Sequence, residues 1–192
     1  MQPSLPDPAD ACGEFLRYDD FMSCSDTYKR LRQAGGIDNV PRQLETYQSM
    51  LRMAQQILDP VRHHFGARVI LTYGFSGPAL SKVLRGTEYP NITPAGDQHA
   101  GSELNRNGSL ICKRRGIAVD FYLPGISSLE VARWVVGNTP FDRLYFYSAH
   151  RPFHVSVGPE ENRSIVFMRG FRGGPHQPVN MTRERFLAEE PR

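Results

Sequence analysis

The sequence predicts a small single domain of the α+β class, with an antiparallel sheet flanked by helices. Three observations support this fold class. Residues 42–65 form one long segment with helical hydrophobic periodicity. Five short runs of β-branched and aromatic residues have the character of strands. Turn-forming residues separate the three runs after residue 140, which favours antiparallel pairing.

The chain length and composition suit one domain with a real core. Its 192 residues are close to the usual size of a single domain, and 40% of them are hydrophobic. The 17 glycines and 15 prolines predict a loop-rich fold rather than a helical bundle. We divide the chain into a flexible arm at 1–17, the domain at 18–170, and a Gly/Pro-rich extension at 171–192 that ends in a short helix.

The first half of the domain is expected to be mainly helical. Residues 18–32 predict a short helix, which the Gly35-Gly36 pair and Pro41 interrupt. The long helix at 42–65 then carries one apolar stripe and ends at Gly66. Its stripe consists of Leu44, Tyr47, Leu51, Ala54, Leu58 and Val61. Because such a stripe is typical of core packing, this helix is expected to cover the sheet.

The second half is expected to supply the sheet. A first strand at 68–73 ends at Gly74, and a long irregular loop occupies 86–116. Further strands are predicted at 117–123, 144–147, 153–157 and 164–168, with a short helix at 128–136 and a terminal helix at 182–190. Loops of such length in a compact domain are usually functional, so we expect a functional role for the loop at 86–116.

Charge and cysteine content narrow the function classes. A net charge of +3 with scattered basic residues gives no support to nucleic-acid binding. Three cysteines form neither a disulfide framework nor a four-thiolate zinc site. The acidic, proline-rich N-terminus lacks the features of a signal peptide, and no apolar run is long enough to enter a membrane. We therefore expect a cytoplasmic protein; delivery by lysis or by a secretion apparatus is compatible with this.

Three polar residues fall on separate elements of the second half. His154 alternates with Phe153 and Val155, so it faces away from their side of the strand. Asp120 lies within an apolar strand, where a carboxylate needs a partner or a cation. His99 lies on the long loop before that strand. Two imidazoles and a carboxylate are the ligand set of an open zinc site, although three unrelated polar residues would give the same pattern.

The residues around this trio resemble a known family. His99, the run Gly116-x-Ala118-x-Asp120 and the run His154-Val155-Ser156 occur in the order found in zinc D-alanyl-D-alanine carboxypeptidases, whose fold is shared with the Hedgehog signalling domain and phage endolysin peptidases. Segments 36–41, 57–66 and 72–75 also look like the corresponding family segments, so the resemblance covers about residues 20–160. It implies a zinc cofactor held by His99, Asp120 and His154.

The sequence departs from the family pattern at three points. His99 and Asp120 are separated by residues 100–119, where the family has a much shorter spacing. The family's acidic general base, three residues before the last histidine, corresponds to Arg151. The arginine that clamps a substrate carboxylate corresponds to Ser76, which is neutral and too short for a bidentate contact.

Other residues could replace these functions. His150 or Glu103 could transfer the proton, and each could equally be structural, His150 in a turn and Glu103 paired with an arginine of its own loop. Arg151 or Arg106 could replace the carboxylate clamp. The inserted loop is tied to ligand positions at both ends, so we expect it to form a rim or lid over the site, with its basic residues favouring an anionic substrate group. A surface excursion is the alternative.

The resemblance implies a zinc-dependent hydrolase that cleaves an amide bond in a peptide or peptide-like small substrate through a metal-activated water. Two alternatives stay open. One is a zinc-binding module of the same fold that has lost catalysis, which the missing base and clamp favour. The other is hydrolysis of a non-peptide intracellular substrate.

Overall fold

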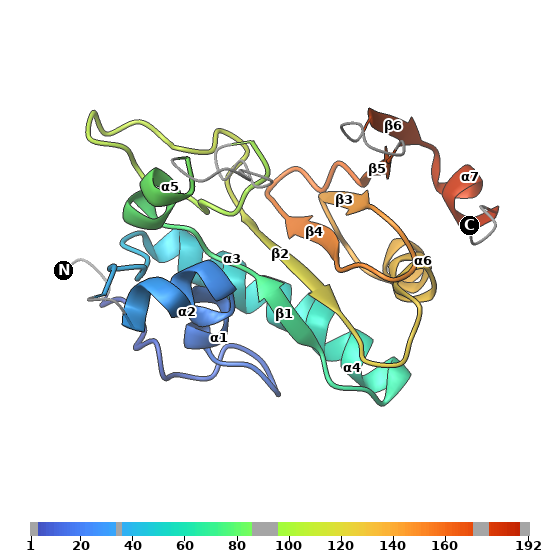
Figure 1. Ribbon diagram of the computed structural model, residues 1–192, viewed down its shortest axis with the longest axis horizontal. Helices are drawn as coiled ribbons and strands as arrows, with labels where there is room; N and C mark the ends of the chain where they lie inside the picture. The colour runs from blue at the N-terminus through green and yellow to red at the C-terminus, as the bar shows by residue number, and fades with distance from the viewer. Residues whose placement is uncertain (1–3, 34–35, 86–95, 171–176, 189–192) are drawn as a thin grey trace.

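A computed structural model describes residues 4–33, 36–85, 96–170 and 177–188 (Figure 1). Its centre is one six-stranded sheet with the strand order β1-β2-β4-β3-β5-β6. The strands are β1 (Ile70–Tyr73), β2 (Ile117–Tyr122), β3 (Arg143–Phe146), β4 (Phe153–Val157), β5 (Ser164–Arg169) and β6 (Gln177–Met181). The first five fall within or close to the strands expected from the sequence; β6 was not expected. Together with the helices, this sheet confirms the α+β class.

The expectation of a purely antiparallel sheet is wrong. β3 and β4 pair antiparallel, but β5 pairs with the other edge of β3 in parallel, with Arg143 opposite Ser164. Because the chain reverses direction at each turn, β5 runs the same way as β3 once it passes β4 to reach that edge. Turn residues show that a chain reverses, whereas the choice of neighbouring strand depends on tertiary packing. The sheet is therefore mixed.

The long predicted helix is confirmed as one continuous helical segment. It comprises α3 (Leu44–Met53), the π-helical turn η1 (Ala54–Leu58) and α4 (Asp59–Phe65). The π turn ends two residues before Pro60, which lacks the N–H that a regular α-helix would use there. Gly66 ends the helix with a φ of 62°, in the left-handed region that glycine adopts without strain.

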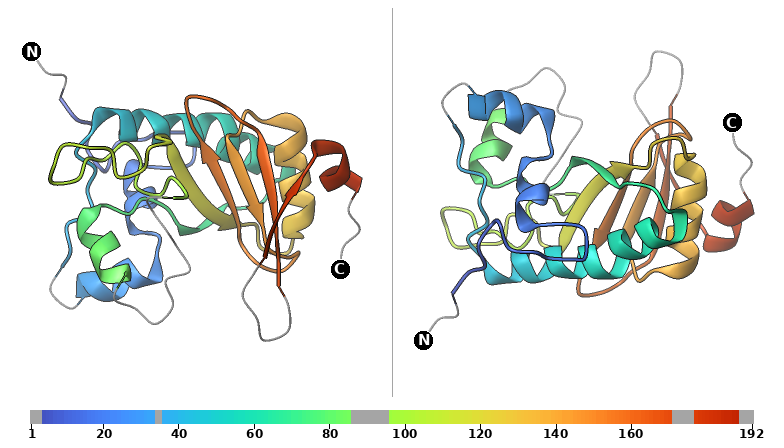
Figure 2. Two further views of the ribbon diagram at one scale, coloured as in Figure 1. Left: turned by 90° about the horizontal axis from the view of Figure 1, so that it is seen from above. Right: turned by 90° about the horizontal axis from the view of Figure 1, so that it is seen from below.

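The helices build the main core against one face of the sheet. Figure 2 shows α3, α4 and α6 (Ser128–Asn138) along one side of the strands. Alternate residues of β2, namely Ile117, Val119 and Phe121, are fully buried in this core. Strand geometry turns the intervening Ala118 and Asp120 to the opposite face. The sheet thus has an apolar face under the helices and a second face that carries polar side chains.

A second, smaller apolar cluster lies at the end of β1. The segment 18–32, expected as one helix, forms two: α1 (Tyr18–Ser23) and α2 (Asp26–Gln33). An unexpected helix, α5 (Pro78–Leu84), contributes Leu80 and Leu84 to this cluster, which also contains Tyr73. Tyr28, Leu31 and Ile37 pack against it. Helices α2 and α5 therefore pack together beside the end of β1.

The chain ends contribute to the same domain. Cys12 is buried, and the Glu14 N–H donates to the Asp59 carboxylate of α4 at 2.8 Å. The expected terminal helix is confirmed as α7 (Arg183–Ala188), whose Phe186 is buried in the main core. Residues 86–95 of the long loop and 171–176 and 189–192 of the extension lie outside the described residues. None of the described helices combines the length and the apolar character that a membrane span requires.

Candidate metal centre

Three predicted ligand residues meet at one point of the structure. His99, Asp120 and His154 each place one ligand atom so that all three atoms lie within 4.8 Å of one another. His99 comes from the loop before β2, Asp120 from β2 and His154 from β4. The structure therefore brings together residues that are up to 55 positions apart, in an arrangement that could hold a metal ion.

Strand register explains why Asp120 and His154 converge. β2 and β4 are antiparallel neighbours, and their pairing sets Asp120 directly opposite His154. Both side chains point away from the helix-covered face, because Phe121 and Phe153 on either side of them fill the core. A slip of one residue in this register would turn one ligand into the core. Burial of the apolar face of both strands thus fixes Asp120 and His154 on the opposite face of the sheet.

Backbone contacts orient the His99 ring. Its Nδ1 lies 2.8 Å from the Gly74 carbonyl oxygen, and because a carbonyl only accepts, Nδ1 carries the proton. The Ser76 N–H donates to the His99 carbonyl at 2.9 Å, which ties the loop to the end of β1. The Tyr73 ring packs edge-on against the imidazole at 4.7 Å. This tautomer leaves Nε2 as an acceptor, 3.7 Å from Asp120 Oδ1.

His154 is held between Asp120 and an aromatic ring. Its Nδ1 lies 2.9 Å from Asp120 Oδ1, and the Tyr145 ring stacks on it at 4.7 Å with an interplanar angle of 16°. Its Nε2 is buried without a hydrogen-bond partner among the described residues. Burial by itself raises the pKa of Asp120, but the hydrogen bond from His154 and the charges of both histidines outweigh it and lower the pKa.

The donor set suits a transition metal such as zinc. Bonds of 2.0–2.1 Å to a tetrahedral zinc ion place ligand atoms about 3.4 Å apart. The 3.7 Å between His99 Nε2 and Asp120 Oδ1 is close to that spacing, whereas the 2.9 Å between His154 Nδ1 and Asp120 Oδ1 reflects a hydrogen bond that a metal would replace. The side chain of Asp120 is 19% exposed and those of the histidines 1–2%. Solvent therefore reaches the cluster beside Asp120.

Glu103, a sequence candidate for proton transfer, is engaged elsewhere. Its buried carboxylate accepts the backbone N–H groups of Arg42 and Gln43 and the Thr46 hydroxyl, at 2.9–3.2 Å. These donors form the N-terminus of α3, where a carboxylate is favoured by the unpaired N–H groups and the helix dipole. Glu103 therefore anchors the inserted loop to α3, and the expected pairing with an arginine of its own loop is replaced by this contact.

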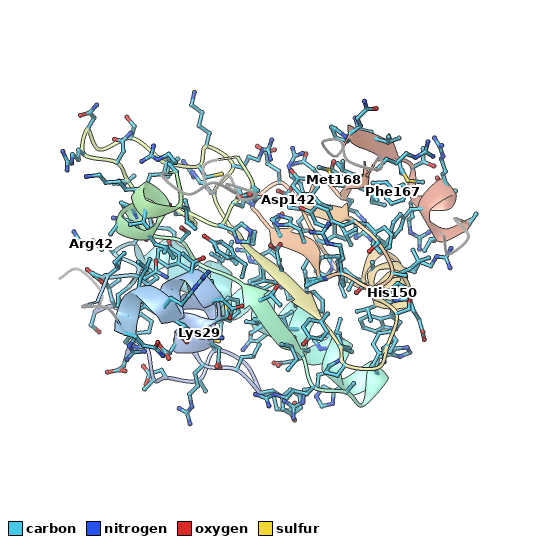
Figure 3. All side chains as sticks on the ribbon, viewed as in Figure 1. Lys29, Arg42, Asp142, His150, Phe167 and Met168 are labelled. Carbon is cyan, nitrogen blue, oxygen red and sulfur yellow. The ribbon has the colours of Figure 1, made fainter. Side chains whose placement is uncertain are left out.

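The other sequence candidates lie in different surroundings. His150 is exposed in the turn between β3 and β4, next to Ala149, whose carbonyl accepts from Ser128 at the start of α6. In Figure 3 His150 is labelled far along the molecule from Arg42, the residue beside Glu103. The Arg151 guanidinium lies 5.5 Å from the Tyr147 ring centre. Ser76 is fully buried and hydrogen-bonded to Ser81, so its hydroxyl faces the interior.

The inserted loop has two parts. Residues 104–110, including the exposed Arg106, form a hairpin closed by a bridge between Leu104 and Leu110, and Glu103 holds it against α3. These contacts tie this part of the insertion to the N-terminus of α3, and the expected lid over the metal cluster stays a prediction. The returning part, before β2, brings Arg114 to the Tyr145 hydroxyl at 3.3 Å, and Tyr145 stacks on His154.

Several residues near the cluster were missed by sequence reasoning. Gln98 is fully buried with a φ of 72°, accepts from the Ser156 hydroxyl at 2.7 Å and donates to the Arg115 carbonyl at 2.8 Å. It thus fastens the loop that bears His99 to β4. Burial raises the pKa of Tyr147, and the negative charges of Asp120 and Asp97 raise it further. Alternation along β3 could have revealed Tyr145 as a neighbour of His154, since the two residues are paired and share one face of the sheet.

The comparisons with known proteins leave the family open. No family model matches the chain, and no match was found among curated proteins or solved structures. The likeness to zinc carboxypeptidases therefore rests on the ordered motif residues and on the cluster that they form.

Proposed function

We propose that the protein is a metal-dependent hydrolase that holds one zinc ion through His99, Asp120 and His154 and cleaves an amide bond in a peptide-like small substrate. The observation that carries this proposal is the convergence of three ligand atoms within 4.8 Å, with the His99 tautomer set by the Gly74 carbonyl. A bound zinc ion would supply Lewis acidity to the amide carbonyl and to water. Asp120 is the partly exposed member of the cluster, which leaves a direction open for substrate.

The residues of the chain supply the proton chemistry in this proposal. Asp97 is the carboxylate whose charge, together with that of Asp120, raises the pKa of Tyr73 and Tyr147, although burial is the larger cause for both tyrosines. Asp97 lies two residues before the proposed ligand His99, on the same loop. We assign proton acceptance to Asp97, in place of the acidic residue that Arg151 replaces. Tyr147 keeps its proton at neutral pH and can donate a hydrogen bond to the carbonyl oxygen.

The test is a zinc-dependent hydrolysis screen over cell-wall peptides and intracellular amides. We expect Asp97→Asn to lower turnover by about 10²–10⁴-fold while the zinc content stays at the parental value, since a positioned base contributes that much. His150→Ala and Glu103→Gln serve as comparison variants and should keep turnover close to that of the parent. Loss of turnover in His150→Ala alone would transfer the base assignment to His150.

A second function has specific support. Glu103 is committed to α3, His150 is exposed beside α6, and Arg151 stands at the family's base position. These placements favour a zinc-stabilised binding module without catalysis. Parental zinc content with no turnover of any substrate, and with no effect of Asp97→Asn on ligand binding, would support this function over the hydrolase.

A further inference from the structure

Arg114 connects the inserted loop to the surroundings of the metal cluster. Its Nη1 donates to the Gly96 carbonyl oxygen, three residues before His99, and to the Tyr145 hydroxyl at 3.3 Å. The Tyr145 ring in turn stacks on His154. One end of the guanidinium is therefore fixed by two contacts, on the loop of the first ligand and on the strand beside the third.

The other end of this guanidinium lacks a partner among the described residues. Arg114 is exposed, and its Nε and Nη2 atoms make no hydrogen bond within the part of the chain that the structure describes. No described acidic side chain forms an ion pair with it. An arginine whose Nη1 is held by the protein presents Nε–H and Nη2–H as a fork, which matches the two oxygens of a carboxylate.

We infer that Arg114 binds a carboxylate of the substrate next to the metal cluster and so determines specificity. This inference rests on the proposed function and extends it to a substrate class: amides that carry a second, anionic group. The two arginines that the sequence suggests for this role are placed differently. Arg106 is on the hairpin beside α3, and Arg151 lies over the Tyr147 ring. The inserted loop between the first two ligands thus supplies the residue that determines specificity, which gives this loop a function.

Two small hydroxamates test the inference on the cobalt-loaded protein. Acetohydroxamate binds a metal through its hydroxamate alone, whereas succinic monohydroxamate adds a carboxylate one short spacer away. The change in the visible cobalt absorption reports binding of each without any turnover. We expect the parent to bind the succinic compound at least about tenfold more tightly than acetohydroxamate, as a charge-assisted contact provides.

The variants separate Arg114 from general charge. Arg114→Gln should abolish the tenfold preference while leaving the affinity for acetohydroxamate unchanged. Arg114→Lys should restore it only in part, because a lysine lacks the fork. Lys113→Gln removes the same charge from the neighbouring exposed position and should keep the full preference. Equal binding of both probes by the parent, or a preference that survives Arg114→Gln, would overturn the inference; failure of the parent to bind cobalt would overturn the proposed function itself.

Discussion

Asp120 and His154 face each other across the pairing of β2 and β4, with His154 Nδ1 2.9 Å from Asp120 Oδ1 on the sheet face that the main helices leave uncovered. Both residues belong to central strands of the sheet and to the candidate metal site. The same alternation that buries Phe121 and Phe153 under the helices turns the carboxylate and the imidazole toward His99. Two of the three proposed ligands thus depend on the register of two central strands, and the third, His99, depends on the loop that Gly74 and Ser76 hold.

The glycine at the start of β2 should be irreplaceable. Gly116 has a φ of 82°, and a Cβ there would lie 1.9 Å from the Val157 carbonyl oxygen on β4. Gly108, at a φ of 75° on the hairpin, has nothing within 4 Å of such a Cβ. Gly108→Ala should cost about 1–2 kcal/mol for the left-handed backbone alone, and Gly116→Ala about 1–3 kcal/mol more for the clash. Urea unfolding of both variants measures the difference, and equal losses would show that the β2–β4 contact is looser than described.

The Glu103 carboxylate should stabilise the fold without affecting the metal. Glu103→Ala leaves three donors at the α3 N-terminus unpaired, so we expect a loss of about 1–3 kcal/mol in the free energy of unfolding. Zinc content should stay at the parental value, because Glu103 is bound to α3 rather than to the cluster. Loss of zinc from a folded Glu103→Ala protein would contradict this structural role.

The same residue should have a distinct pH signature. Burial, the largest cause, raises the pKa of Glu103 even though its hydrogen bonds oppose the shift. The folded state therefore binds the proton more tightly than the unfolded chain, whose glutamate titrates near pH ~4.3. Stability from this group is present below that pH and falls as the pH rises through the raised value. Glu103→Gln should remove this part of the pH dependence; a parallel profile for parent and variant would disprove the assignment.

Gln98 should act as a positioning residue for His99. Gln98→Ala removes the acceptor of the Ser156 hydroxyl proton and the donor to the Arg115 carbonyl, which should cost about 1–3 kcal/mol in unfolding free energy. Because Gln98 precedes a proposed ligand, the zinc affinity should also fall, by about 10–100-fold as for other supporting contacts. Asn138→Ala, at an exposed amide on α6, is the matched control and should change neither quantity. A Gln98→Ala protein with parental zinc affinity would show that the contacts with Gly74, Ser76 and Tyr73 position His99 without Gln98.

Local patterns allowed much of this architecture to be predicted. The apolar stripe from Leu44 to Val61 predicted the long helix. Alternation along its strand predicted that His154 points to the sheet face opposite Phe153 and Val155. The parallel pairing of β5 with β3 was missed because strand patterns carry no information about neighbours. Helix α5 was not predicted because a segment of seven residues is too short to show a clear helical hydrophobic period.

Only part of the candidate metal site could be predicted from the sequence, for the same reason. His99, Asp120 and His154 were found through their order and spacing, and the structure brings them together. The partners of Glu103 could not be predicted from local patterns, because Arg42 and Gln43 lie about 60 residues earlier in the chain. Arg114 and Gln98 gave no local signal, since their importance comes from contacts with Tyr145 and Ser156 on other strands.

The central claim is that His99, Asp120 and His154 hold one zinc ion, and elemental analysis of protein purified without chelator tests it most directly. Paired thermal unfolding with and without added zinc reports whether the metal binds the folded state. We predict about one zinc per chain in the parent and a higher Tm with zinc. His154→Ala should remain folded, lose the metal and show no rise in Tm, whereas His150→Ala should behave as the parent. A parent protein that carries no metal and gains no stability from zinc would contradict the account.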